Sequence, residues 1–195
     1  MTAFDLNVYW SREADEHMVV ARDSFTTLSG PFAAWVDLCL ASLQDGGKLL
    51  LFGNGGSAGD SQHLATELTA RYSKNRPAIA AIALTTDSSA LTAIGNDFGF
   101  EHLFARQIEA LGKPGDVAIG ISTSGQSPNV LRGLETARRM GLKTSGLTGR
   151  DGGGMPPLCD VLLTVPSPTT ARIQEMHITL GQMLCGALEQ KLGLV

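Results

Sequence analysis

The sequence predicts an α/β fold, a three-layer sandwich in which helices cover both faces of an open five-stranded parallel sheet. Five short apolar runs, each followed by glycine or small polar residues, are the candidate strands: 48–53, 79–84, 117–122, 144–148 and 161–165. Helix-forming stretches separate them. Strands that are apolar on both faces are typical of a parallel sheet, and strand–helix alternation indicates an open sheet covered on both sides.

Candidate helices lie between and after these strands, at about 57–72, 87–94, 101–111, 128–140 and 170–192. A flavodoxin-like strand order is expected, because ligands of open α/β sheets bind beyond the carboxyl ends of the strands at a topological switch point. The chain has 195 residues, a length that fits one domain. We therefore expect a single domain over 1–195, with an α/β core over 47–195.

Two further candidate helices precede the first strand. Residues 10–28 are amphipathic with Ser11 as a possible N-cap, and residues 31–45 follow a Gly-Pro break. Their apolar side chains lie outside the strand–helix alternation: Met18, Val19, Phe25, Phe32, Trp35, Val36 and Leu40. Apolar stripes of this size are seldom exposed on a monomer. Residues 1–46 are therefore expected to form a helical segment that packs against copies of itself.

Composition excludes several classes of protein. The net charge is −4, whereas general nucleic-acid binders are normally basic, so nucleic acid is not an expected partner. No apolar run reaches the roughly 18 residues of a membrane span. The three cysteines form no CxxC pair, which indicates reduced thiols and a cytoplasmic protein.

A glycine-rich loop, Gly53-Asn54-Gly55-Gly56-Ser57, follows the first strand and opens the next helix. Glycine lets the backbone approach a ligand closely, and a helix N-terminus presents free N–H groups to an anion. The spacing is neither GxGxxG nor that of a P-loop. The loop predicts contact with a ligand, although a simple strand–helix turn explains the same residues.

Four hydroxyl side chains crowd the loop after the third strand: Ser122, Thr123, Ser124 and Ser127. Ser127 and Pro128 fit the N-cap and N1 positions of the next helix. Hydroxyl and N–H groups at a helix N-terminus suit a phosphate held without fixed cations. Capping needs only one hydroxyl, so this hydroxyl loop predicts a phosphate site.

Two pairs of polar side chains are spaced to share a helix face. His63 and Glu67 are one turn apart, and an imidazole and a carboxylate so placed can bind a metal ion or act as an acid–base pair. Gln174 and Gln182 are a little over two turns apart on the last helix. His177 is close enough to Gln174 to share its face. On spacing alone, solvated helix surfaces are the better explanation of both pairs.

Taken together, these motifs resemble the sugar isomerase (SIS) domain, and within it the phosphoheptose isomerases. The resemblance spans about residues 45–190 and is carried by GNGGSAGDSQHLATEL, ALTTD, IGNDFGF, GDVAIGISTSGQSPNVL, LTGRDGG and ARIQEMH. It implies an aldose–ketose isomerase that converts D-sedoheptulose 7-phosphate to D-glycero-D-manno-heptose 7-phosphate through an enediol or enediolate. The product would supply activated heptose for lipopolysaccharide or other surface glycans. N-terminal helices assemble members of this family into tetramers, so a homotetramer is implied.

The resemblance also implies roles for individual residues. Contacts to the sugar phosphate are implied for Asn54, Gly55, Gly56, Ser57, Glu67, Asn96, Asp97 and Gln174. The 7-phosphate would be held by Ser122, Thr123, Ser124 and Ser127. The implied catalytic residues, with Glu67 as the base, are His63, Glu67 and Gln174. The implied ligands of a zinc ion are His63, Glu67, Gln174 and Gln182.

One position departs from the family pattern. The family usually has a histidine, as metal ligand and acid–base partner, where this chain has Gln182. An amide cannot carry a proton, so zinc binding should be weaker, and His63, His177 or water would have to replace that partner. A related branch of the fold binds the bacterial replication initiator protein, which leaves a non-catalytic sugar-phosphate or initiator-binding protein as the alternative. Glu67 favours the enzyme, because the equivalent position in that branch is not acidic.

Overall fold

A computed structural model describes residues 4–195 of the chain. Within this range the α-helices are α1 (Leu6–Thr27), α2 (Ser29–Gln44), α3 (Gly56–Thr69), α4 (Ser88–Phe98), α5 (Leu103–Leu111), α6 (Pro128–Arg139) and α7 (Thr170–Lys191). The strands are β1 (Leu49–Gly53), β2 (Ala81–Ala83), β3 (Val117–Ser122), β4 (Lys143–Gly149) and β5 (Val161–Val165). Short 3₁₀ turns are η1 (Phe100–His102) and η2 (Pro156–Leu158).

The strands form one parallel sheet in the order β2-β1-β3-β4-β5, which confirms the flavodoxin-like order. β2 lies on one side of β1, and the later strands lie on the other side. The switch point therefore falls between β1 and β3, which end at Gly53 and Ser122. This places the glycine loop and the hydroxyl loop side by side, at the edge where an open α/β sheet binds its ligand.

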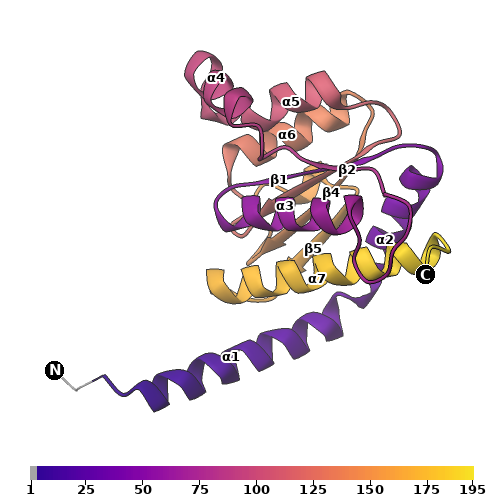
Figure 1. The fold of residues 1–195 in the computed structure, drawn as a ribbon. Helices are drawn as coiled ribbons and strands as arrows, with labels where there is room; N and C mark the ends of the chain where they lie inside the picture. The colour runs from indigo at the N-terminus through magenta and orange to yellow at the C-terminus, as the bar shows by residue number, and fades with distance from the viewer. Residues whose placement is uncertain (1–3) are drawn as a thin grey trace.

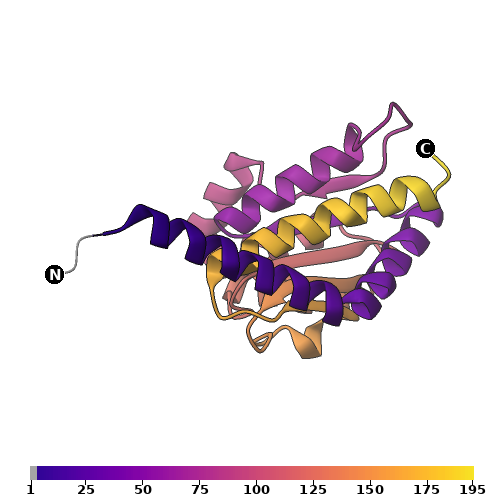
Figure 2. The ribbon, with the colours of Figure 1, turned by 90° about the horizontal axis from the view of Figure 1, so that it is seen from below.

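Helices cover both faces of the sheet, so the three-layer sandwich is also confirmed. In Figure 1, α5 and α6 lie on one side of the strands and α7 on the other, and Figure 2 shows α3 beside α7. Alternate residues of β1 serve the two layers. Leu49 and Leu51 join the core beneath α2, α3 and α7, whereas Leu50 and Phe52 join the core beneath α5 and α6.

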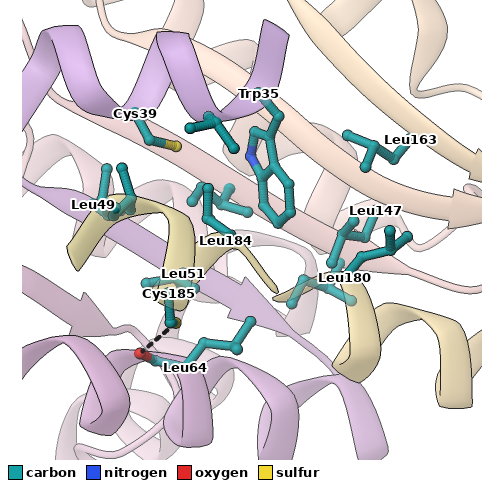
Figure 3. Close-up of a cluster of buried hydrophobic side chains, with 14 of the residues drawn as sticks. Trp35, Cys39, Leu49, Leu51, Leu64, Leu147, Leu163, Leu180, Leu184 and Cys185 are labelled. Atoms are coloured by element: carbon teal, nitrogen blue, oxygen red, sulfur yellow. Dashed lines mark hydrogen bonds between the residues drawn. The ribbon is translucent and has the colours of Figure 1, made fainter. Parts of the chain in front are cut away.

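The larger core cluster is centred on Trp35, a residue of α2 whose indole N–H donates to Ser145 Oγ over 2.9 Å. Figure 3 shows the buried side chains around it: Cys39, Leu49, Leu51, Leu64, Leu147, Leu163, Leu180, Leu184 and Cys185. Val36 is buried as well. The expectation that Trp35 and Val36 form an exposed apolar face is wrong, because α2 packs into the core of its own chain.

Helix α1 lies largely outside this core and projects from the body of the molecule (Figures 1 and 2). Only two of its 22 residues are buried. It begins earlier than predicted, because Asp5 rather than Ser11 accepts the capping bonds from the first-turn N–H groups. Large apolar side chains that stay exposed on this helix include Met18, Val19 and Phe25. Among residues 4–195, no helix is long and apolar enough to cross a membrane.

Candidate active site

The glycine loop turns the chain sharply from β1 into α3. Gly55 has φ of 57°, a left-handed conformation that other residues rarely adopt. A Cβ atom on Gly53 would lie 2.7 Å from the carbonyl oxygen of Ile121, and one on Gly56 would lie 2.6 Å from Nε2 of Gln174. The turn therefore requires glycine at Gly53 and Gly55, and the side chain of Gln174 rests directly on the loop at Gly56.

The hydroxyl loop connects β3 to α6. Ser122 is buried, while Thr123, Ser124 and Ser127 are half-buried. Ser127 occupies the predicted N-cap position and Pro128 begins the helix, yet the Ser127 hydroxyl does not cap it. Its Oγ instead lies 3.1 Å from Oγ of Ser122. The hydroxyl is thus turned into the loop, next to the helix N-terminus at which an anion is favoured.

A second loop, between β4 and β5, supports the hydroxyl loop from behind. The N–H of Gly154 donates to the carbonyl oxygen of Gly125 over 2.9 Å. A Cβ atom on Gly125 would clash with the carbonyl oxygen of Gly152. Met155, in the same supporting loop, is fully buried. Backbone-to-backbone packing therefore fixes the shape of the hydroxyl loop.

Two cavities meet at Asn54, the residue after β1. One of ≈ 490 Å³ lies between the glycine loop and helices α4 and α5, with Gly55 and Gly95 in its wall. The other, of ≈ 520 Å³, lies against the start of α6, and its wall includes Ser127 and Arg132. Both volumes fall in the range of small-molecule sites. The glycine loop and the hydroxyl loop therefore border one ligand-sized region.

Asn96 and Asp97 lie near the end of α4, immediately after Gly95. Nδ2 of Asn96 donates to Oδ1 of Asp97 over 2.7 Å, and both residues are exposed. Neither belongs to the walls of the two cavities around Asn54. The structure therefore places them beside the first cavity rather than in its wall.

His63 and Glu67 of α3 face Gln182 of α7. Nε2 of His63 lies 3.4 Å from Oε1 of Glu67 and 2.8 Å from Nε2 of Gln182. Nε2 of His63 is thus the ring nitrogen that faces both Glu67 and Gln182. The Glu67 side chain is 20% exposed, which leaves its carboxylate accessible to a ligand. Because Gln174 lies against the glycine loop, α7 joins this polar cluster to the predicted sugar site.

His177 does not belong to this cluster. It is fully buried, and its Nε2 lies 3.0 Å from the carbonyl oxygen of Thr148. Burial lowers the pKa of this imidazole to about 4. Residues 177 and 182 are about 140° apart around a helix that turns about 100° per residue. The hypothesis that His177 supplies a proton to the substrate is therefore wrong, because its ring is buried in the core.

The donor set can be compared with what zinc requires. A catalytic zinc ion normally has three protein ligands drawn from His, Cys, Asp and Glu. Here His63 and Glu67 supply one imidazole and one carboxylate, while Gln174 and Gln182 supply only amides. Within the part of the chain that the structure describes, no three His, Cys, Asp or Glu side chains are grouped to hold a metal ion. The residues present do not complete a zinc site of the kind that the resemblance implies.

One residue of this region, Asn129 of α6, was missed by the motif analysis. Its buried amide exchanges two hydrogen bonds with the amide of Asn54, at 2.8 Å and 2.9 Å. A signal for it exists in the sequence, because Asn129 shares a helix stripe with the buried residues Gly133 and Ala137. A polar side chain on a buried stripe needs a hydrogen-bonding partner.

Comparison with known proteins places the chain in a family. The family model described as the SIS domain matches residues 15–149. The phosphoheptose isomerase of Paramagnetospirillum magneticum is 57% identical over 181 residues, covering 93% of this chain and 94% of that protein. The phosphoheptose isomerase of Campylobacter jejuni is 53% identical over 179 residues, covering 92% of this chain and 96% of that protein.

Solved structures agree with these sequence relatives. The phosphoheptose isomerase from Neisseria gonorrhoeae matches with a TM-score of 0.91 at 44% identity, covering 95% of this chain and 100% of that one. The enzyme of the same name from Francisella tularensis matches with a TM-score of 0.93 at 33% identity, covering 96% of this chain and 100% of that one. The protein therefore belongs to the SIS-domain family and, within it, to the phosphoheptose isomerases.

Proposed function

We propose that the protein is an aldose–ketose isomerase that converts D-sedoheptulose 7-phosphate to D-glycero-D-manno-heptose 7-phosphate. The observation that carries this proposal is the convergence of Glu67, His63 and Gln182 between α7 and α3, the helix that the glycine loop opens. A half-buried carboxylate that is accessible to a ligand and lies next to an imidazole can act as the general base for proton transfer at carbon. Family membership supplies the substrate.

The reaction moves one proton between carbons and one between oxygens. In our proposal the Glu67 carboxylate takes a proton from C1 of the open-chain ketose while O2 gains one, which gives the enediol. Glu67 then returns its proton to C2 as O1 loses its proton, which leaves the aldose. One carboxylate that reaches both carbons is sufficient for the carbon-to-carbon transfer.

The oxygen atoms need a donor that Gln182 cannot be, because an amide does not exchange protons near neutral pH. His63 is the group on this chain that fits, since an imidazole can carry a proton and its Nε2 lies 3.4 Å from Oε1 of Glu67. The amide of Gln174, resting on the glycine loop, is placed to donate a hydrogen bond to the charge that develops on O1 and O2.

The phosphate end of the substrate is assigned to the hydroxyl loop, with Ser122, Thr123, Ser124 and Ser127 as its donors. Asn54 and the exposed pair Asn96 and Asp97 are assigned to the sugar hydroxyls, with the backbone of Gly55, Gly56 and Ser57 beside them. The phosphate group is at the opposite end of the substrate from the reacting carbons, C1 and C2. The free energy gained by binding the phosphate would keep the open-chain sugar in position for Glu67.

A divalent ion has a secondary place in this proposal. His63 and Glu67, with the amide oxygens of Gln174 and Gln182, would hold a zinc ion only weakly, because amides are poor zinc ligands. The proton transfers described above are assigned to groups of the chain itself.

We also propose a homotetramer assembled through α1, because Met18, Val19 and Phe25 leave an apolar stripe exposed there. Sedimentation of a stable monomer at micromolar concentration would contradict it. The free cysteines fit a cytoplasmic enzyme whose product supplies heptose for lipopolysaccharide or other surface glycans.

Turnover of sedoheptulose 7-phosphate by the purified protein tests the function. The aldose product is followed by NMR in three samples: as purified, with added zinc, and with a chelator. Calorimetry on the same samples measures binding of the sugar phosphate. Binding without turnover in all three samples would reject the isomerase and leave the non-catalytic sugar-phosphate-binding protein, which Gln182 favours. Neither turnover nor binding would reject both.

A further inference from the structure

Asn129 links the two loops that border the ligand region. It is the second residue of α6, two residues after Ser127 of the hydroxyl loop, whereas Asn54 belongs to the glycine loop. Nδ2 of Asn54 donates to Oδ1 of Asn129 over 2.8 Å, and Nδ2 of Asn129 donates back to Oδ1 of Asn54 over 2.9 Å. The two amides thus form a closed pair across the switch point of the sheet.

Burying the amide of Asn129 at this position costs free energy unless both hydrogen bonds to Asn54 form. Asn129 is 1% exposed, and its neighbours on the buried face of α6 include Val130 and Leu134. Burying an amide without partners is destabilising, whereas an apolar side chain at this position would need none. The amide of Asn129 is therefore best explained by what it does to Asn54.

The two hydrogen bonds to Asn129 fix the orientation of the side-chain amide of Asn54. An amide has two N–H donors and an oxygen with two lone pairs, and Asn129 takes up one donor and one lone pair. The remaining donor and lone pair of Asn54 are available at the position where the two cavities meet. Without Asn129, the amide could rotate about its last torsion angle and present either end to a ligand.

We propose that Asn129 is a positioning residue, which orients the amide of Asn54 toward the sugar. It acts on the substrate through Asn54 and not by direct contact. This inference rests on the proposed function for its readout, but the geometry that carries it does not depend on the identity of the sugar phosphate.

A double-mutant cycle tests the inference. Asn54→Ala, Asn129→Ala and the double variant are compared by kcat/KM for sedoheptulose 7-phosphate. Each single change should lower kcat/KM about tenfold, the effect of roughly one hydrogen bond to a ligand. The double variant should be no worse than the poorer single variant, because residues that act as a unit are not additive. Additive losses would overturn the proposal, since Asn129 would then act independently of Asn54.

A second readout separates positioning from general damage to α6. Inorganic phosphate, as a competitive inhibitor, reports on the hydroxyl loop alone. Asn129→Ala should leave its inhibition constant within about twofold, as expected when the hydrogen bonds to phosphate are kept. A parallel rise in this constant would overturn the proposal, because Asn129 would then be shaping the phosphate site directly. Thr136→Ala is the matched control: it truncates another buried polar side chain of α6 about two turns away and should leave kcat/KM unchanged.

The cycle can be completed even if Asn129→Ala fails to fold. Asn129→Asp keeps the shape and the acceptor for Asn54 but loses the donated bond, and it enters the same cycle. A parent protein without isomerase activity would refute the proposed function but not this inference, because the same non-additivity is then read from sugar-phosphate dissociation constants. Turnover by the parent together with additive effects refutes the inference alone.

Discussion

Two glutamates lie at different positions along the interface of α3 and α7, and their surroundings differ. Glu189 is 1% exposed and accepts hydrogen bonds from Arg76 Nε at 2.8 Å and from the N–H of Tyr72 at 2.9 Å. Glu67 is 20% exposed, and His63, 3.4 Å away, is its one ion-pair partner among the described residues. The first carboxylate is surrounded by donors, and the second keeps free lone pairs.

The number of hydrogen bonds that each carboxylate makes, more than its residue type, decides whether it has a structural or a catalytic role. A buried carboxylate whose bonds are all made is held in place and unavailable to a ligand. A partly exposed carboxylate with few partners can exchange a proton with a ligand. Arg76 joins the two ends, because its Nη2 also donates to the backbone carbonyl oxygen of Glu67 over 2.7 Å. The buried pair thus anchors the turn of α3 that carries the candidate base.

Glu67→Gln should produce the largest change in activity. It preserves the shape of the side chain and removes the base, so we expect kcat to fall by about 10²–10⁴-fold, the usual contribution of general acid–base catalysis. Stability should change little, because Glu67 makes few contacts that require its charge. Steady-state kinetics and chemical denaturation measure the two effects. Turnover equal to that of the parent would show that Glu67 is not the base.

The same substitution at Glu189 should lower stability strongly and kcat only slightly. Glu189→Gln leaves the guanidinium of Arg76 buried without its counter-charge, and removing one partner of a buried pair is destabilising by about 3–5 kcal/mol. The folded fraction should keep far more of its kcat than Glu67→Gln does. Denaturant unfolding at fixed protein concentration measures the loss.

A surface pair provides the control for this measurement. Asp37→Asn removes the exposed partner of Lys191 on the neighbouring helix and should change stability by less than about 1 kcal/mol. If Glu189→Gln is no more destabilising than Asp37→Asn, the buried pair does not have the anchoring role described here.

Local patterns predicted the fold and one half of the site. The strands, their flavodoxin-like order and the two loops follow from apolar runs, glycines and hydroxyls that are adjacent in the sequence. The long-range contacts did not follow. Spacing could not distinguish Gln182, which reaches His63, from His177, which points into the core. Arg76 and Glu189 are separated by 113 residues, and only the packing of α7 against α3 brings them together.

Substitutions in the hydroxyl loop should affect substrate binding rather than proton transfer. A Ser122→Ala/Ser124→Ala double variant should raise KM for sedoheptulose 7-phosphate roughly 5- to 150-fold, since two lost hydrogen bonds amount to about 1–3 kcal/mol. Neither kcat nor stability should change as much as with the two glutamate variants. Ser11→Ala, at an exposed position of α1, is the matched control. Unchanged affinity in the double variant would place the phosphate elsewhere.

Gln182→His tests whether the cluster around Glu67 can be completed as a metal site. An imidazole at this position would replace the amide that now contacts Nε2 of His63 and would give the cluster a third strong ligand. We expect zinc to bind at least about tenfold more tightly, the lower end of what even supporting residues contribute at metal sites. Calorimetric titration of chelator-treated protein with zinc measures the change. Gln190→His adds a histidine at an exposed position in the last turn of the same helix and corrects for non-specific binding. Equal gains in the two variants would mean that His63 and Glu67 are not arranged as zinc ligands, and that Glu67 is set apart from Glu189 by its accessibility alone.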